Sequence, residues 1–221
     1  MLNEENATLE AHLNEEQRKL LSGLDSPAKI QAYLDTTAYR PEYSNLCPLR
    51  VMQTGRAHCL DGAVFAAAAL RRLGFPPLLV DIFPDPGMDD DHVLAVFRRS
   101  GRWGAVAKSN FVGLRYRDPV YRDLRELVMS YFEQFYNVDG IKTLRTYTPP
   151  LNLARFDRLG WEWNDAGVDA IEQALLKRRR IAVISPEMAA ALAPVDPITY
   201  QAGLLIANPE GLYQPKTSRE A

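Results

Sequence analysis

The sequence has few cysteines and histidines and no long apolar segment. Its 221 residues include two cysteines and three histidines. Two cysteines are too few for a disulfide framework, so we expect both to be reduced thiols in a cytoplasmic protein. No segment approaches the roughly 18 consecutive apolar residues of a membrane span, and the acidic N-terminus has no apolar signal-peptide core. These absences predict a cytoplasmic chain without a membrane partner.

Neither sign of charge is in excess. The chain has 26 Lys and Arg residues against 28 Asp and Glu residues, for a formal net charge of -2. This balance argues against nonspecific binding of nucleic acid, which needs a positive surface, and the basic run KRRR at 177–180 is interpreted as a solvated helix end. The sequence has no glycine-rich phosphate-binding motif and no CxxC or HxxxH spacing. We therefore expect no nucleic-acid partner, no cofactor and no metal.

An apolar content of 47% and a charged content of 24% are ordinary for a globular protein, and the length suffices for a sizeable core. The expected parts of the chain are N-terminal helices over 3–35, a core over about 45–140, a C-terminal helical extension over 160–195 and a polar tail over 208–221. Because no clean linker separates them, the sequence predicts a single domain over 1–221, of the α+β class, with additional helices at both ends.

The first predicted helix carries a stripe of leucines at steps of seven and four, namely Leu2, Leu9, Leu13, Leu20 and Leu24. Such a stripe packs on the core or pairs with a second copy of the chain, so a homo-oligomer through this helix is one possibility. Ser26 and Pro27, an N-cap and a first-turn proline, predict a second helix that ends before Pro41. Residues 36–54 show neither the helical nor the strand periodicity and are interpreted as a connecting loop with one short extended piece.

The middle of the chain predicts a buried helix followed by antiparallel strands. From Cys59 an alanine-rich run without a polar face continues to Gly74, a glycine that caps the helix. Segments 78–83, 92–97 and 103–107 have the composition of strands, and RRSGR between the last two is typical of a hairpin turn.

Three further helix starts are marked by capping residues. Asp118 before Pro119 predicts an amphipathic helix that runs to about residue 136. Asn164 and Ser185 predict the N-caps of two helices nearer the C-terminus.

Cys59 opens the predicted buried helix. The free N–H groups and the dipole at a helix start favour thiolate over thiol, and the same N–H groups can hold an oxyanion. A thiolate nucleophile also needs a general base, and the chain offers His12, His58 and His92. His12 belongs to the charged N-terminal helix, and His58, as the neighbour of Cys59, projects in another direction. His92 begins a strand after an acidic loop, so it is the expected base.

The order of these features resembles the transglutaminase-like superfamily, within the papain-like fold. The resemblance covers about residues 53–110 and rests on Cys59 opening the helix, LRRLGFP at the helix exit, His92, and Trp103 in the returning strand. It implies a buried helix carrying Cys59 packed on an antiparallel sheet. It also implies acyl transfer or hydrolysis at an amide-type bond, with Cys59 as nucleophile and His92 as base. Gln53 is similar to the oxyanion glutamine of papain-like proteases.

The chain departs from this family at the third catalytic residue. Members usually carry an Asp four or five positions after the strand tryptophan, where this sequence has Ala107 and Lys108. Asn110 is the expected substitute, by analogy with Cys-His-Asn enzymes. The alternatives are Lys108, Ser109, Asp118 or no third residue.

Two classes of function follow from this reasoning. In the first, the protein is a peptidase, amidase or transglutaminase-like enzyme whose substrate is a peptide, a protein or a small amide. In the second, it is a non-catalytic binding or scaffolding protein that retains the fold. Without the resemblance, Cys59 would be a small buried residue and His92 a satisfied strand histidine.

Overall fold

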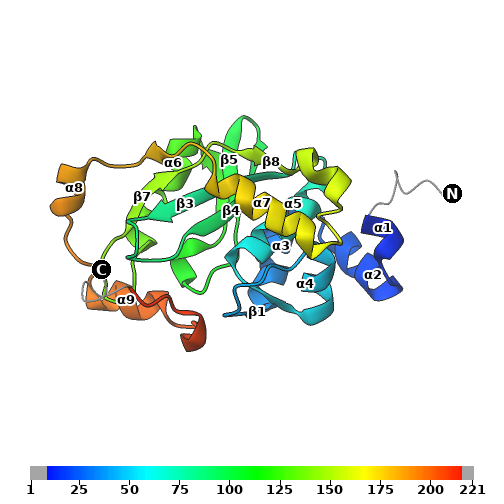
Figure 1. Ribbon diagram of the computed structural model, residues 1–221, viewed down its shortest axis with the longest axis horizontal. Helices are drawn as coiled ribbons and strands as arrows, with labels where there is room; N and C mark the ends of the chain where they lie inside the picture. The colour runs from blue at the N-terminus through cyan, green and yellow to red at the C-terminus, as the bar shows by residue number, and fades with distance from the viewer. Residues whose placement is uncertain (1–8, 216–221) are drawn as a thin grey trace.

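A computed structural model describes residues 9–215 of the chain and confirms the α+β class (Figure 1). Its centre is a seven-stranded antiparallel sheet in the order β6-β5-β4-β3-β7-β9, with β8 also paired to β3. The strands are β3 (Leu78–Pro84), β4 (His92–Arg99), β5 (Arg102–Val106), β6 (Arg117–Tyr121), β7 (Leu144–Tyr147), β8 (Leu151–Asn152) and β9 (Ile181–Ala182). A separate parallel pair joins β1 (Ala38–Tyr39) to β2 (Arg56–Ala57).

Most of the helices begin after a residue whose side chain accepts a hydrogen bond from a first-turn N–H group. They are α1 (Leu9–His12), α2 (Glu15–Gly23), α3 (Pro27–Thr36), α4 (Pro48–Thr54), α5 (Cys59–Arg72), α6 (Leu124–Met129), α7 (Asp165–Leu176), α8 (Pro186–Ala190) and α9 (Pro197–Gly203). The predicted caps Ser26, Asn164 and Ser185 each accept a hydrogen bond from a backbone N–H in the first turn.

Helix α5 is the buried helix that the sequence predicts. It packs on β4 and is surrounded by α3, α4 and α7, which lie on the same side of the sheet (Figure 1). Along β4 the side chains alternate, so that Val93 and Ala95 join the core around α5 while Leu94 and Val96 join a second core. The second core lies on the other face of the sheet and includes residues of α6. Both faces of the central strands are therefore buried.

The predicted helix over 118–136 is wrong at both ends, since the α-helix within it, α6, ends at Met129 and a separate 3₁₀ turn covers Phe132–Gln134. Residues 117–121 form strand β6 at the edge of the sheet. Pro119 is tolerated there because one side of an edge strand pairs with no other strand, so not every residue has to donate a backbone N–H. The helix α6 starts later, after Asp123, whose carboxylate accepts from the N–H of Glu126. Asp118 is thus an exposed strand residue and not a cap.

Two predictions near the N-terminus also need correction. The single first helix is broken into α1 and α2, because Asn14 and Gln17 form a capping box that starts a new helix. The predicted loop over 36–54 contains helix α4, which begins after Cys47 with Pro48 at its first position.

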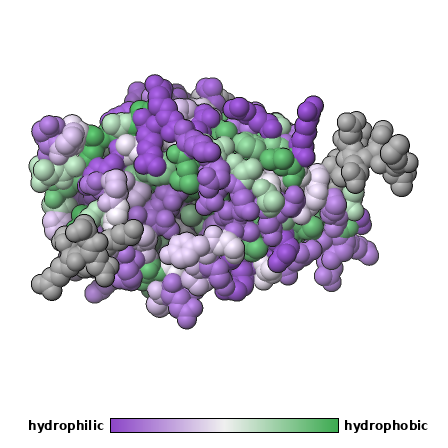
Figure 2. All heavy atoms as spheres, in the orientation of Figure 1, coloured by the Kyte–Doolittle hydropathy of each residue, from purple (hydrophilic) through white to green (hydrophobic). Residues whose placement is uncertain are grey.

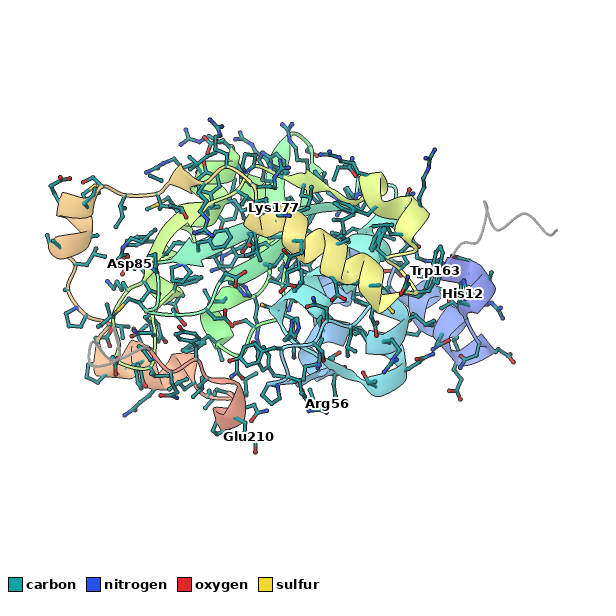
Figure 3. All side chains as sticks on the ribbon, viewed as in Figure 1. His12, Arg56, Asp85, Trp163, Lys177 and Glu210 are labelled. Atoms are coloured by element: carbon teal, nitrogen blue, oxygen red, sulfur yellow. The ribbon has the colours of Figure 1, made fainter. Side chains whose placement is uncertain are left out.

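The leucine stripe is divided between described and undescribed residues. Leu2 lies outside the described residues, whereas Leu9, Leu13 and Leu24 are buried in the chain's own core and Leu20 is half-buried. The homo-oligomer through this stripe stays a prediction. His12, expected to face solvent, is exposed at one edge and stacks on Trp163 with 4.8 Å between ring centroids (Figure 3).

Hydrophilic side chains cover much of the face seen in Figure 2, with smaller groups of apolar side chains among them. None of the helices formed by residues 9–215 is both long enough and apolar enough to cross a membrane.

Candidate functional site

The start of α5 is fixed by a buried network around Asp61. His58 is the N-cap: its Nδ1 accepts from the N–H of Asp61 at 3.4 Å, and the Asp61 carboxylate accepts from the N–H of His58 at 3.1 Å. The same carboxylate accepts from Arg40 Nη1 at 3.0 Å and from the N–H of Leu46 at 2.7 Å. Asp61 is 0% exposed, so all of these bonds lie inside the protein. They hold Cys59 at the first position of the helix, as the sequence predicts.

Cys59 is half-buried and lines two cavities. The larger has a volume of about 140 Å³ and is called here the acidic cavity, because Asp81, Asp90 and Asp91 line it together with Cys59. The smaller has a volume of about 60 Å³ and is called the histidine cavity, because His92 lines it with Cys59.

The thiol of Cys59 lies in a negative environment. Its Sγ is 3.8 Å from the carbonyl oxygen of Asp91. Burial, followed by the charges of Asp91, Asp90 and Asp81, raises the pKa of the Cys59 thiol well above its ordinary value. The expectation that the helix start favours a thiolate is therefore wrong for this structure, since burial and the carboxylates outweigh the N–H groups. These surroundings favour the neutral thiol over the thiolate.

His92 is buried and held by one main-chain group. The ring is 4% exposed, and its Nε2 lies 2.8 Å from the carbonyl oxygen of Leu114. Because a carbonyl only accepts, Nε2 carries the proton and Nδ1 keeps its lone pair. Burial lowers the pKa of His92 to about 4. The ring is thus a neutral base near pH 7, with its free nitrogen at Nδ1.

The structure brings Cys59 and His92 to one cavity without joining them. Alternation along β4 directs His92 toward the second core, where its partner Leu114 lies, while α5 occupies the other face. The two side chains share the histidine cavity. Within the described residues no hydrogen bond links Cys59 Sγ to the His92 ring. Catalytic hydrogen bonds are often long or misaligned in unliganded enzymes, so this arrangement is compatible with a nucleophile and its base.

Asn110 lines the histidine cavity but does not take the expected orienting role. Its Nδ2 donates to the carbonyl of Asn208 at 2.9 Å and its Oδ1 accepts from the N–H of Asn208 at 2.7 Å. Both ends of the amide are therefore used by the C-terminal segment, and the group that positions His92 is the carbonyl of Leu114. A main-chain carbonyl has no sequence signature, which is why sequence reasoning missed it.

The other expected residues are also engaged elsewhere. Ser109 Oγ accepts from the N–H of Phe111 at 3.0 Å, and Lys108 Nζ donates to the carbonyl of Leu34 at 2.9 Å. Gln53 is exposed near the end of α4 and lines neither cavity. The expected oxyanion contact of Gln53 is therefore not formed here, and the first-turn N–H groups of α5 are the donors next to Cys59.

The C-terminal segment covers the site. Gly211 and Tyr213 line both cavities, and Glu210, labelled in Figure 3, lines the acidic one. Asn208 starts a short turn before Pro209, and its Nδ2 donates to the carbonyl of Tyr39 at 3.1 Å. The predicted polar tail is thus wrong for residues 208–213, while 216–221 lie outside the described residues. The Asn-Pro pair, a cap followed by a first-turn proline, is a signal that indicates local structure here.

Neither a scan against protein-family models nor a search of curated proteins finds a match for this chain.

Proposed function

We propose that the protein is a cysteine-dependent enzyme that transfers or hydrolyses an acyl group at an amide-type bond, on a transglutaminase-like core and in the cytoplasm. The observation that carries the proposal is the cavity shared by Cys59, at the start of a buried helix, and His92, at the start of the adjacent strand. A neutral imidazole with a free nitrogen and a thiol that line one cavity are the two groups that acyl transfer needs.

The proposed reaction begins with a neutral pair. Sγ of Cys59 attacks the substrate carbonyl carbon while Nδ1 of His92 takes the thiol proton, since the raised pKa of the thiol and the low pKa of the imidazole disfavour a preformed ion pair. The backbone N–H of Cys59, in the first turn of α5, holds the oxyanion. The carbon–nitrogen bond then breaks as His92 returns the proton to the leaving amine. Water or a second amine releases the acyl group from the Cys59 thioester.

A second candidate function is a non-catalytic binding protein. The segment 208–213 over the cavities and the commitment of Asn110 to Asn208 favour it, because both restrict access to Cys59. An acylation experiment separates the two functions.

The test is acylation by an activated ester, p-nitrophenyl acetate, followed by mass spectrometry of the peptides that carry Cys59 and Cys47. Cys47 is an internal control, because it is buried and burial raises its pKa to about 12. The enzyme proposal expects a thioester on Cys59 alone, formed at least about tenfold more slowly in His92→Gln, in line with the loss of a general base. His92→Gln keeps a donor for the Leu114 carbonyl. Failure of Cys59 to acylate, or equal rates in both proteins, favours the binding protein.

A further inference from the structure

The acidic cavity has an excess of carboxylates over cations. Six carboxylate side chains line it: Glu42, Asp81, Asp90, Asp91, Glu172 and Glu210. The cationic side chain in the lining, Arg40, is 5% exposed, bonds to Asp61 and to Ser44, and pairs with Glu42 at 3.3 Å. His58 is kept largely neutral, since burial lowers its pKa. Among the six carboxylates, Glu42 is the one that pairs with a cation within the described residues, so the other five leave the cavity with a negative potential.

An acidic cluster alone is not a binding site, and two buried atoms give the independent observation. Asp81 Oδ1 and Asn45 Oδ1 have no hydrogen-bond partner, although Asp81 is 1% and Asn45 7% exposed. Both residues line the acidic cavity. Buried polar atoms almost always have a partner, so each exception calls for an explanation. Here both exceptions are oxygen atoms of residues that line one cavity.

The orientation of the Asn45 amide is fixed by its neighbours. Its Nδ2 donates to Asp169 Oδ1 at 2.9 Å and to Glu172 Oε2 at 3.1 Å. Carboxylates only accept, so the amide cannot be turned to place its nitrogen in the cavity without losing both bonds. The atom that Asn45 presents without a partner is therefore an acceptor. The group that satisfies it must be a donor.

Charge, donors and size together define the missing ligand. A primary ammonium has three N–H donors and a guanidinium five, and either carries the positive charge that the carboxylates require. Leu60, Val93 and Leu175 supply apolar lining for a short alkyl chain. The volume of about 140 Å³ is close to that of an engineered cavity that binds benzene. Among residues 9–215 no group of three His, Cys, Asp or Glu side chains is arranged to hold a metal ion.

We propose that the acidic cavity binds an alkylammonium or alkylguanidinium group of the substrate, through Asp81 and Asn45. The cation is a recognition group that stays protonated and does not react. This inference rests on the proposed function only in assigning the cation to a substrate of Cys59, which lines the same cavity.

The test is isothermal titration calorimetry of the full chain at low ionic strength and about pH 8, where alkylamines stay protonated. The probes are n-butylammonium and n-butylguanidinium, with 1-butanol as the neutral analogue. We expect at least one cation to bind and 1-butanol not to bind. Burial and the neighbouring Asp91 raise the pKa of Asp81 well above its ordinary value, and a bound cation favours the ionised carboxylate. Binding should weaken at least about tenfold in Asp81→Asn, which keeps the shape of the side chain and removes the carboxylate that pairs with the cation. Asp118→Asn, an exposed carboxylate outside the cavity, is the matched control and should bind like the wild type.

Asn45→Ala is a second variant, for the case that Asp81→Asn does not fold by circular dichroism, and it should weaken cation binding several-fold. Equal binding of 1-butanol, no binding of either cation, or unchanged affinity in a folded Asp81→Asn or Asn45→Ala protein would overturn the inference. Cys59→Ser distinguishes the inference from the proposed function. If this variant binds the cation while the wild type shows no acylation of Cys59, the enzyme proposal fails and the cation site stands. If Cys59 of the wild type is acylated but neither cation binds, the cation site is overturned and the enzyme proposal stands.

Discussion

Asn110 and Asn208 hold each other through two hydrogen bonds, of 2.9 and 2.7 Å, although 98 residues separate them in the chain. Through this pair the C-terminal segment is attached beside the cavities that Cys59 lines. The residue expected to orient a catalytic histidine instead fastens the segment that covers the site. Access to Cys59 therefore depends on Asn110.

Replacing Asn110 with alanine should open the site. The substitution removes both hydrogen bonds, so we expect alkylation of Cys59 by iodoacetamide to become several-fold faster and the free energy of unfolding to fall by about 1–2 kcal/mol. Mass spectrometry of the labelled peptides and urea unfolding measure the two effects. Asn152→Ala is the control, since Asn152 also bonds to a backbone N–H but lies on the exposed surface. Slower labelling of Cys59 in Asn110→Ala would contradict the fastening role.

We expect Asp91 to lower the reactivity of Cys59. Its carboxylate is the strongest of the nearby charges that raise the pKa of the thiol, after burial itself. Removing a negative charge favours the thiolate, so Asp91→Asn should lower the pKa and increase the rate of labelling at about pH 8 several-fold. The measurement is the labelling rate of Cys59 as a function of pH. Asp25→Asn, at an exposed carboxylate, should leave the pH dependence of Cys59 labelling unchanged. An unmoved profile in Asp91→Asn would show that burial alone determines the pKa.

His92 should make stability depend on pH in a defined window. Its pKa is lowered to about 4 in the folded protein, below the ordinary value of about 6.5. Between these values the unfolded chain binds the proton that the folded chain excludes, so stability is lost as the pH falls through this range. For this group alone the loss between pH 7 and pH 5 is roughly 2 kcal/mol.

The His92→Gln variant isolates that contribution. Other groups titrate in the same window, including Asp89, whose pKa burial raises to about 6 and which acts with the opposite sign. The difference between wild type and His92→Gln cancels them. Urea unfolding at the two pH values should show a smaller loss of stability on acidification in His92→Gln than in the wild type. An equal loss in both proteins would contradict a buried neutral ring.

Local signals predicted much of the fold. The caps Ser26, Asn164 and Ser185 form as expected, because a capping side chain needs only the N–H groups two or three residues away. The hairpin turn is likewise local: Ser100 and Gly101 both adopt positive φ, of 50° and 78°, as a two-residue hairpin turn requires. The buried helix followed from the absence of a polar face between Cys59 and Gly74.

Long-range pairings account for what the sequence did not reveal. Residues 117–121 form a strand because β6 pairs with β5, and neither Pro119 nor the apolar spacing carries information about that partner. In the candidate site, too, local features could be predicted and long-range contacts could not. The positions of Cys59 and His92 at element starts were predictable, whereas the Leu114 carbonyl and Asn208 reach the site from distant parts of the chain. The unpartnered Oδ1 of Asp81 likewise has meaning only once the cavity exists.

Removal of the Asp61 carboxylate should lower the free energy of unfolding more than removal of any other carboxylate. Asp61→Ala leaves the guanidinium of Arg40 buried without its main partner, and it removes acceptors from the N–H groups of Leu46 and His58. Loss of one member of a buried ion pair costs about 3–5 kcal/mol, so we expect a decrease of that size in the free energy of unfolding measured with urea. Asp25→Ala is the matched control, because Asp25 pairs with Lys29 at 2.6 Å on the exposed surface, where ion pairs contribute little. Similar losses in the two variants would mean that the network around Asp61 does not stabilise the start of α5. A large loss confined to Asp61→Ala would instead identify this network as the support that keeps Cys59 in place.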